Sequence, residues 1–149
     1  MRFRAFVLML VFGEAYLGAA EFVGTSPCGA MVREFIGISR TEPCDKITWR
    51  LNISQTNTFM LNATYGLQEQ SAPGYVSGGK SVMMEGKWTM KGTGPRKVYA
   101  IQANKSDRAM SILRVNENLL QLLGTDGKSL IGNEFWSYTL NRKDVGKSR

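Results

Sequence analysis

The stretch KITWRLNISQTNTFMLNATY, residues 46–65, alternates apolar and polar side chains through two consecutive segments. In the first segment Ile47 and Trp49 share one parity, and polar residues occupy the other. In the second segment Phe59 and Leu61 share one parity, and the other parity is polar except for Met60. A period of two is the pattern of a β-strand that buries one face. Polar turn residues separate the two segments, so the stretch predicts an antiparallel hairpin.

The same alternation continues along the chain and predicts further strands. We expect them at residues 32–39, 82–90, 97–103, 109–115, 119–124, 128–132 and 136–142. The pair Asp126-Gly127 is a strong turn signal, because both central positions of a type I′ hairpin turn need positive φ. No stretch beyond the N-terminal segment shows sustained helical spacing. The sequence therefore predicts an all-β domain, an antiparallel meander of about eight short strands closed or nearly closed into a barrel.

The alternation also predicts which side chains face the barrel interior. An eight-stranded barrel is either just filled by side chains or has room for one small ligand. The many bulky inward residues favour a filled interior, and a carrier of a small apolar ligand remains an alternative. The candidate interior or ligand-contacting residues are Trp49, Phe59, Trp88, Met90 and Tyr138.

The N-terminus has the order of a secretory signal peptide. Arg2 and Arg4 precede an apolar run at residues 5–12, and small residues follow at 18–20. The apolar run is shorter than the roughly 20 residues that span a bilayer, so we expect no transmembrane anchor. The candidate cleavage positions follow Ala15, Ala19 and Ala20.

These boundaries divide the chain into a signal peptide at residues 1–20, a barrel domain at 21–142 and a basic flexible tail at 143–149. Bacterial lipoprotein signals place a lipid-bearing cysteine where this chain has Ala20, so no acyl anchor is expected either. We predict a periplasmic or secreted protein. Disulfides persist in that oxidising environment.

Composition excludes several classes of function. The chain contains no histidine, which removes Ser-His and Cys-His catalysis and the commonest zinc and copper ligand. We therefore expect neither an enzyme nor a cofactor. The formal net charge of +7 would favour an anionic envelope surface as a contact. The basic side chains form no stripe, and no nucleic-acid module is recognisable, so nucleic acid is not an expected partner.

Several short motifs follow one another in an order that resembles a known family. They are Phe35-Ile36-Gly37, Glu42-Pro43-Cys44-Asp45-Lys46-Ile47, Ala63-Thr64-Tyr65-Gly66, Glu85-Gly86-Lys87-Trp88-Thr89, residues 115–122 and Asp126-Gly127-Lys128. Over residues 35–132 the chain resembles the N-terminal domain of the copper-resistance lipoprotein NlpE. The resemblance implies a small lipocalin-like or half-open barrel at the outer membrane, associated with sensing of envelope stress, copper and surface adhesion. The family's C-x-x-C pair is absent here, because Cys44 is followed by Asp45-Lys46-Ile47, with Ile47 where the second cysteine would stand.

Cys28 and Cys44 are the two cysteines of the chain. Their spacing excludes a C-x-x-C redox pair, and two thiolates without an imidazole cannot complete a tetrahedral metal site. A Cys28–Cys44 disulfide is the remaining interpretation. The alternative is that both thiols stay reduced and pack as small apolar groups.

The leading functional prediction is a non-enzymatic envelope module that binds an unknown envelope protein or small ligand. A copper protein is the alternative, since thioethers suit Cu(I), with Met83, Met84 and Met90 as weak candidate ligands. An inhibitor of a cell-wall hydrolase fits less well, because such enzymes are often basic and the positive charge of this chain would repel them.

Overall fold

The computed structural model describes residues 20–92 and 94–143 of the chain. The predicted signal peptide therefore lies outside the described residues except for Ala20, and the predicted basic tail lies outside them except for Lys143.

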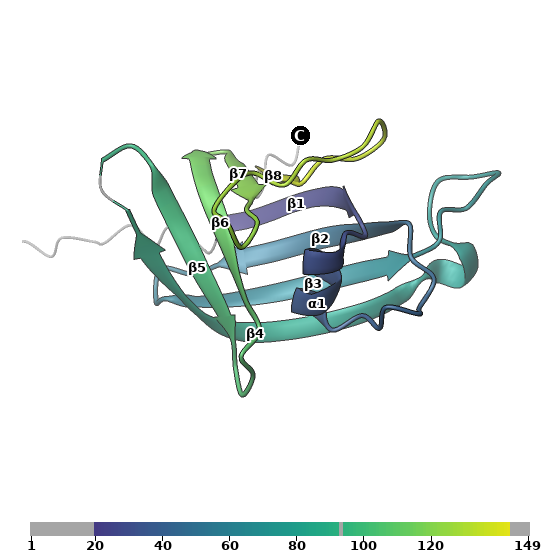
Figure 1. Cartoon of the computed structure of the whole chain (residues 1–149), viewed down its shortest axis with the longest axis horizontal. Coiled ribbons are helices and arrows are strands. Elements are labelled where there is room, and N and C mark those ends of the chain that lie inside the picture. The colour runs from purple at the N-terminus through teal and green to yellow at the C-terminus, as the bar shows by residue number, and fades with distance from the viewer. Residues whose placement is uncertain (1–19, 93, 144–149) are drawn as a thin grey trace, which may run out of the picture.

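The described residues form a closed antiparallel β-barrel of eight strands in sequence order, as predicted (Figure 1). Each strand pairs with the next, and β8 returns to pair with β1. The strands are β1 (Ala20–Pro27), β2 (Lys46–Ile53), β3 (Thr58–Gly66), β4 (Lys80–Lys91), β5 (Lys97–Ala103), β6 (Ala109–Asn116), β7 (Leu119–Leu122) and β8 (Thr139–Arg142). A short α-helix, α1 (Ala30–Ile36), and a single 3-10 turn, η1 (Val76–Gly78), complete the fold.

The β2–β3 hairpin has the register that its alternation predicts. Trp49 lies opposite Ala63, and Ile53 lies opposite Phe59 next to the turn. Asn57 takes the positive φ of 61° that the tight turn requires, a conformation that asparagine tolerates better than most residues. The inward residues of both strands are consequently buried.

The first strand was predicted in the wrong place. Residues 32–39 contain helix α1 and the turn after it, and the strand that precedes β2 is β1. Val32, Phe35 and Ile36 are the buried residues of α1, and their spacing of three and one puts them on one helical face. Gly37 ends the helix in the left-handed region at φ 87°, which a glycine adopts without strain. In Figure 1 the helix lies in front of β2 and β3, beside β6.

The C-terminal part of the barrel is also shorter than predicted. The strand expected at residues 128–132 is absent, and a single bridge between Leu123 and Ser129 takes its place. The strand expected at 136–142 begins only at Thr139. A long loop at residues 123–138 therefore joins β7 to β8.

The core lies inside the barrel and under α1, and its buried side chains pack in one cluster. Among the predicted interior residues, Trp49, Phe59 and Tyr138 are buried, and Trp88 is half-buried. Met90 is a correction, because 39% of its surface is exposed. The reason is strand length: β3 pairs with β4 only as far as Lys87, so Met90 has β5 as its neighbour on one side alone.

Candidate functional site: a groove at the disulfide end

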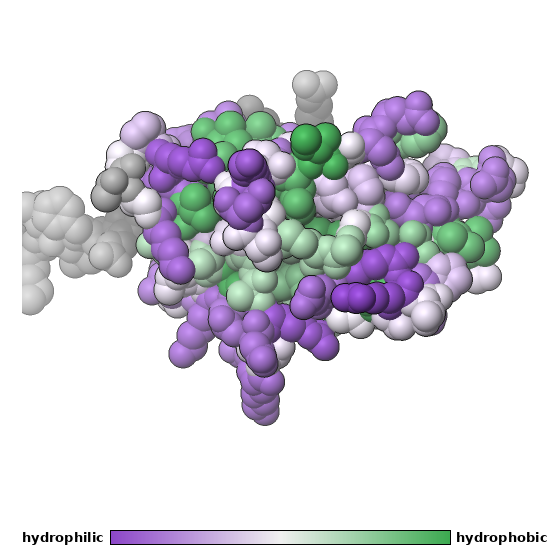
Figure 2. Space-filling view, viewed as in Figure 1, coloured by the Kyte–Doolittle hydropathy of each residue, from purple (hydrophilic) through white to green (hydrophobic). Residues whose placement is uncertain are grey.

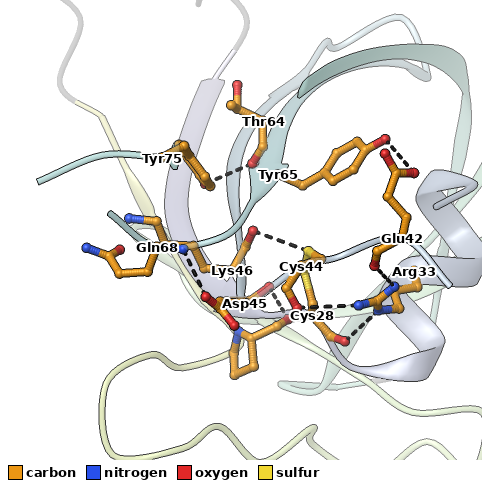
Figure 3. The surroundings of a disulfide bond; sticks show 12 residues. Cys28, Arg33, Glu42, Cys44, Asp45, Lys46, Thr64, Tyr65, Gln68 and Tyr75 are labelled. Carbon is orange, nitrogen blue, oxygen red and sulfur yellow. Dashed lines mark hydrogen bonds between the residues drawn. A yellow bond between two sulfur atoms is a disulfide. The ribbon is translucent and has the colours of Figure 1, made fainter. Parts of the chain in front are cut away.

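The disulfide end of the barrel is the end where β1 finishes and β2 begins. Cys28 and Cys44 form the predicted disulfide there, with Cα atoms 5.9 Å apart (Figure 3). The bond closes a segment that contains α1. The helix is therefore tied to the barrel at both of its flanks.

The side chain of Arg33 holds the same segment from within. Its guanidinium donates hydrogen bonds to the carbonyl oxygens of Cys28 (3.1 Å), Ser39 (2.9 Å), Glu42 (2.9 Å) and Cys44 (3.3 Å). Figure 3 shows the guanidinium directed at the backbone beside the disulfide. The planar fork of arginine suits several acceptors at once, so one side chain fixes the course of the whole segment.

The loop between β3 and β4, residues 67–79, is fastened to the outside of the barrel through Tyr75. The Tyr75 hydroxyl shares a 2.6 Å hydrogen bond with the Thr48 hydroxyl and donates a 2.9 Å hydrogen bond to the carbonyl oxygen of Thr64. The Lys46 ammonium lies 4.6 Å from the centroid of the Tyr75 ring, a cation–π distance. Burial raises the pKa of Tyr75, so it stays a neutral hydrogen-bonding group at ordinary pH.

The same loop is held at its other flank by Asp45. One carboxylate oxygen of Asp45 accepts the backbone N–H of Gln68 at 2.9 Å. Gln68 in turn forms an isolated β-bridge with Tyr75. The loop is thus held to the barrel by Asp45 at one flank and by the Tyr75 contacts at the other.

The loop between β7 and β8 has a rigid tip. The side-chain oxygen of Asn133 accepts the backbone N–H groups of Phe135 and Trp136, both at 2.9 Å. The Asn133 N–H donates to the carbonyl oxygen of Trp136, again at 2.9 Å. This tip presents two large apolar side chains to solvent, with Ile131 90% exposed and Phe135 73% exposed.

Tyr138 anchors this loop to the barrel. Its hydroxyl accepts the backbone N–H of Gly29, and burial raises its pKa. A side chain at Gly29 would overlap the Tyr138 hydroxyl, so the position requires glycine. Tyr138, one of the predicted interior or ligand-contacting residues, therefore supports this loop.

A groove of about 920 Å³ lies between the two loops, with the disulfide in its lining. Figure 1 shows the two loops projecting at the same end of the barrel, and in Figure 2 hydrophilic residues prevail over both, with hydrophobic residues among them. Asp45 and Glu69 contribute carboxylates to the lining, and Phe135 and Trp136 contribute aromatic rings. The described residues that line the groove include no lysine or arginine.

The other predicted site residues lie away from the groove. The indole of Trp88 donates to the carbonyl oxygen of Ser54 at 3.0 Å and meets Tyr99 edge-on, with ring centroids 5.2 Å apart. This contact is at the opposite end of the barrel from the disulfide. Trp49 and Phe59 belong to the core.

The three methionines proposed as copper ligands are not gathered at one point. Met83 is 65% exposed on the outside of β4, whereas its neighbour Met84 is buried on the inside. Successive residues of a strand point to opposite faces, so these two thioethers cannot share an ion. Within residues 20–92 and 94–143, no group of three or more histidine, cysteine, aspartate or glutamate side chains is placed to hold a metal.

The sequence did not predict the groove residues Asp45, Glu69, Phe135 and Trp136. A signal was present for the aromatic pair, since two adjacent large aromatics follow the turn formers Gly132 and Asn133 in a short unpatterned stretch. Adjacent apolar residues next to a turn are hard to bury together.

The described residues form a small, disulfide-containing, closed eight-stranded barrel with a groove at one end. No family model, curated protein or solved structure matches the chain. In the part of the chain that the structure describes, no helix has the length and apolarity needed to cross a membrane.

Proposed function

We propose that the protein is a non-enzymatic binding module of the cell envelope, periplasmic or secreted, which contacts a partner through the groove at the disulfide end. The observation that carries this proposal is the rigid construction of both groove walls around exposed aromatic surface. Solvent-exposed apolar side chains on an ordered loop are typical of interaction sites. A groove whose walls are already ordered also costs little conformational entropy on binding.

The disulfide supports the extracytoplasmic part of the proposal. Cys28 and Cys44 are bonded, and such bonds are rare in reducing compartments. The predicted signal peptide and the resemblance to the NlpE N-terminal domain indicate the same location.

The electrostatics of Glu42, which has both Lys80 and Tyr65 as hydrogen-bonding partners, support a binding role over catalysis. A hydrogen bond from Lys80 lowers the pKa of Glu42, and Tyr65 also donates to this carboxylate, at 3.2 Å. General acid–base catalysis needs a pKa near the working pH. The pKa of Glu42 is shifted away from neutrality, as expected of a structural ion pair.

The packing of the interior supports a partner on the outside rather than a ligand within. Trp49, Leu51 and Leu61 each keep 2% or less of their surface exposed and belong to one continuous cluster. Close-packed side chains leave no room for a carried molecule. Fatty acids and hydrophobic dyes should accordingly leave the melting temperature unchanged, because a ligand of the native state would raise it.

Site-specific photo-crosslinking in the envelope of the producing organism tests the proposal. A photoreactive residue at Phe135 or Gln70, on the two walls of the groove, should yield the same discrete crosslinked product. The control position is Val115, which is 49% exposed at the far end of β6. Equal yields from all three positions, or recovery of the protein in the cytoplasm, would contradict the proposal.

A further inference from the structure

We propose that the groove takes a cationic segment of a partner protein, with Asp45 and Glu69 receiving lysine or arginine side chains and the Phe135–Trp136 pair receiving apolar ones. This inference rests on the proposed function and names the chemistry of the partner. The charge of the groove lining is opposite in sign to that of the whole chain. The whole chain has a formal net charge of +7, yet the charged residues that line the groove are both acidic.

Each of the two carboxylates is positioned by one backbone contact. Asp45 Oδ2 accepts the N–H of Gln68 at 2.9 Å, and Glu69 Oε1 accepts the N–H of Gln70 at 3.1 Å. Neither carboxylate forms an ion pair with a described residue. The second oxygen of each carboxylate is therefore open to a donor from a partner.

Three cations in or next to the segments that form the groove already have partners within the protein. Arg33 donates to four backbone carbonyl oxygens. Lys46 is buried and lies over the ring of Tyr75. Lys80 pairs with Glu42. Each of these three positive charges is therefore engaged by groups of the protein itself, and the charged residues that line the groove are both acidic.

The aromatic side chains of Phe135 and Trp136 require a second property of the partner segment, namely aliphatic surface beside its positive charge. The rings of Phe135 and Trp136 are tilted by 50° with centroids 5.7 Å apart, and Phe135 is largely exposed. Such faces accept the aliphatic stems and the charged ends of lysine and arginine. Ile131 extends the apolar surface at the loop tip.

Size and chemistry together indicate a polypeptide. A groove of about 920 Å³ is far larger than a metal ion or a simple amine requires. It also offers carboxylates and apolar surface side by side, which a chain with mixed cationic and apolar side chains matches. An anionic lipid surface would be repelled by Asp45, Glu69 and the neighbouring Glu134.

The probe is a fluorescein-labelled ten-residue peptide of arginine and leucine in equal numbers, titrated into the oxidised full chain at low salt. Fluorescence anisotropy measures the affinity, and amide NMR shifts locate the contact. The double variant D45N/E69Q keeps both side chains as hydrogen-bond acceptors for the backbone N–H groups. We expect it to weaken binding about five- to tenfold, the effect of losing two partly exposed ion pairs.

The matched control is D107N/E117Q, which changes the net charge equally at exposed positions outside the groove lining. It should leave the affinity within about twofold. Equal weakening by the two double variants would overturn the inference, since it would show a general charge effect. The variant F135A should also weaken binding, with V115A as its control.

Two further probes separate this inference from the proposed function. A peptide of glutamate and leucine that shifts the groove amides would overturn the cationic partner but leave a binding groove intact. Vesicles of anionic phospholipid that bind the wild type and not F135A would show a membrane contact and overturn the inference as well. If no probe shifts the amide resonances of the groove residues, and photo-crosslinking also yields no discrete product, both the inference and the proposed function are contradicted.

Discussion

The indole N–H of Trp49 donates a 2.8 Å hydrogen bond to the hydroxyl of Ser26 inside the barrel. Ser26 is fully buried and Trp49 is 2% exposed, so water cannot replace either partner. The bond joins β1 to β2 just below the disulfide. It satisfies the one polar atom of the largest side chain in the core.

We therefore predict that Ser26→Ala lowers the free energy of unfolding by about 1–3 kcal/mol, because it leaves the Trp49 N–H buried without an acceptor. Urea unfolding followed by tryptophan fluorescence measures the change. Ser81→Ala, at an exposed position on β4, should change the stability by less than about 0.5 kcal/mol. Equal effects of the two substitutions would contradict the structural role of the bond.

The disulfide should contribute about 3 kcal/mol to stability, the chain-entropy value for a loop of about 15 residues. Reduction, or the double variant C28S/C44S, should lower the melting temperature by several degrees. Thiol labelling and intact mass of the unreduced protein should show no free thiol. Two labelled cysteines in the native protein would sink this prediction.

Arg33→Lys should destabilise the segment between the cysteines by about 2 kcal/mol, because an ammonium cannot reach the four carbonyl oxygens that the guanidinium contacts. The effect should not add to that of reduction, since both changes loosen the same segment. A double-mutant cycle with C28S/C44S measures the coupling, and strict additivity would argue against it. Arg96→Lys, on an exposed arginine with one hydrogen bond to Gly127, is the control.

Gly86 lies on the inner face of β4, against β5 and the ring of Phe59. A Cβ at this position would overlap the carbonyl oxygen of Gln102 and would lie 2.6 Å from the Phe59 ring. Gly86→Ala should therefore destabilise the barrel by about 1–3 kcal/mol, the usual cost of overpacking. Lys87→Ala, at the adjacent outward position, should be nearly neutral in the same urea titration. A stable G86A with wild-type melting behaviour would refute the close approach.

The ion pair of Glu42 with Lys80 should make stability depend on pH at the acid end. The hydrogen bond from Lys80 lowers the pKa of Glu42 below its ordinary value of 4.5. The stabilisation is then fully present above pH 4.5 and is lost as the pH falls through the lowered pKa. The stability difference between wild type and Glu42→Gln should shrink steadily on acidification below that point. A difference that stays constant from pH 7 to about pH 2 would contradict this prediction.

Much of the barrel could be predicted because strand alternation is a local property. The hairpin at residues 46–65 and the strand at 97–103 appear with nearly the predicted bounds, since a period of two is visible within a few residues. A shift by one residue would turn every apolar side chain outward, so the pattern also determines the register. The disulfide could be predicted because the chain has only two cysteines.

Two elements near the N-terminus could not be predicted in this way. Helix α1 is seven residues long, and its buried Val32, Phe35 and Ile36 belong to residue types that also favour strands. Their helical spacing spans little more than one turn, too short for a periodic signal. Strand β1 carries Gly24 and ends in Pro27, and its pairing with β2 and β8 makes it a strand.

The groove is a product of tertiary structure alone. Asp45, Glu69 and Phe135 come from three segments that are far apart in the sequence, and no pattern links them. They meet because closure of the barrel brings the start of β2, the β3–β4 loop and the β7–β8 loop to one end. Alternation specifies which face of a strand is buried, but the ends of a barrel are set by how all eight strands are staggered around it.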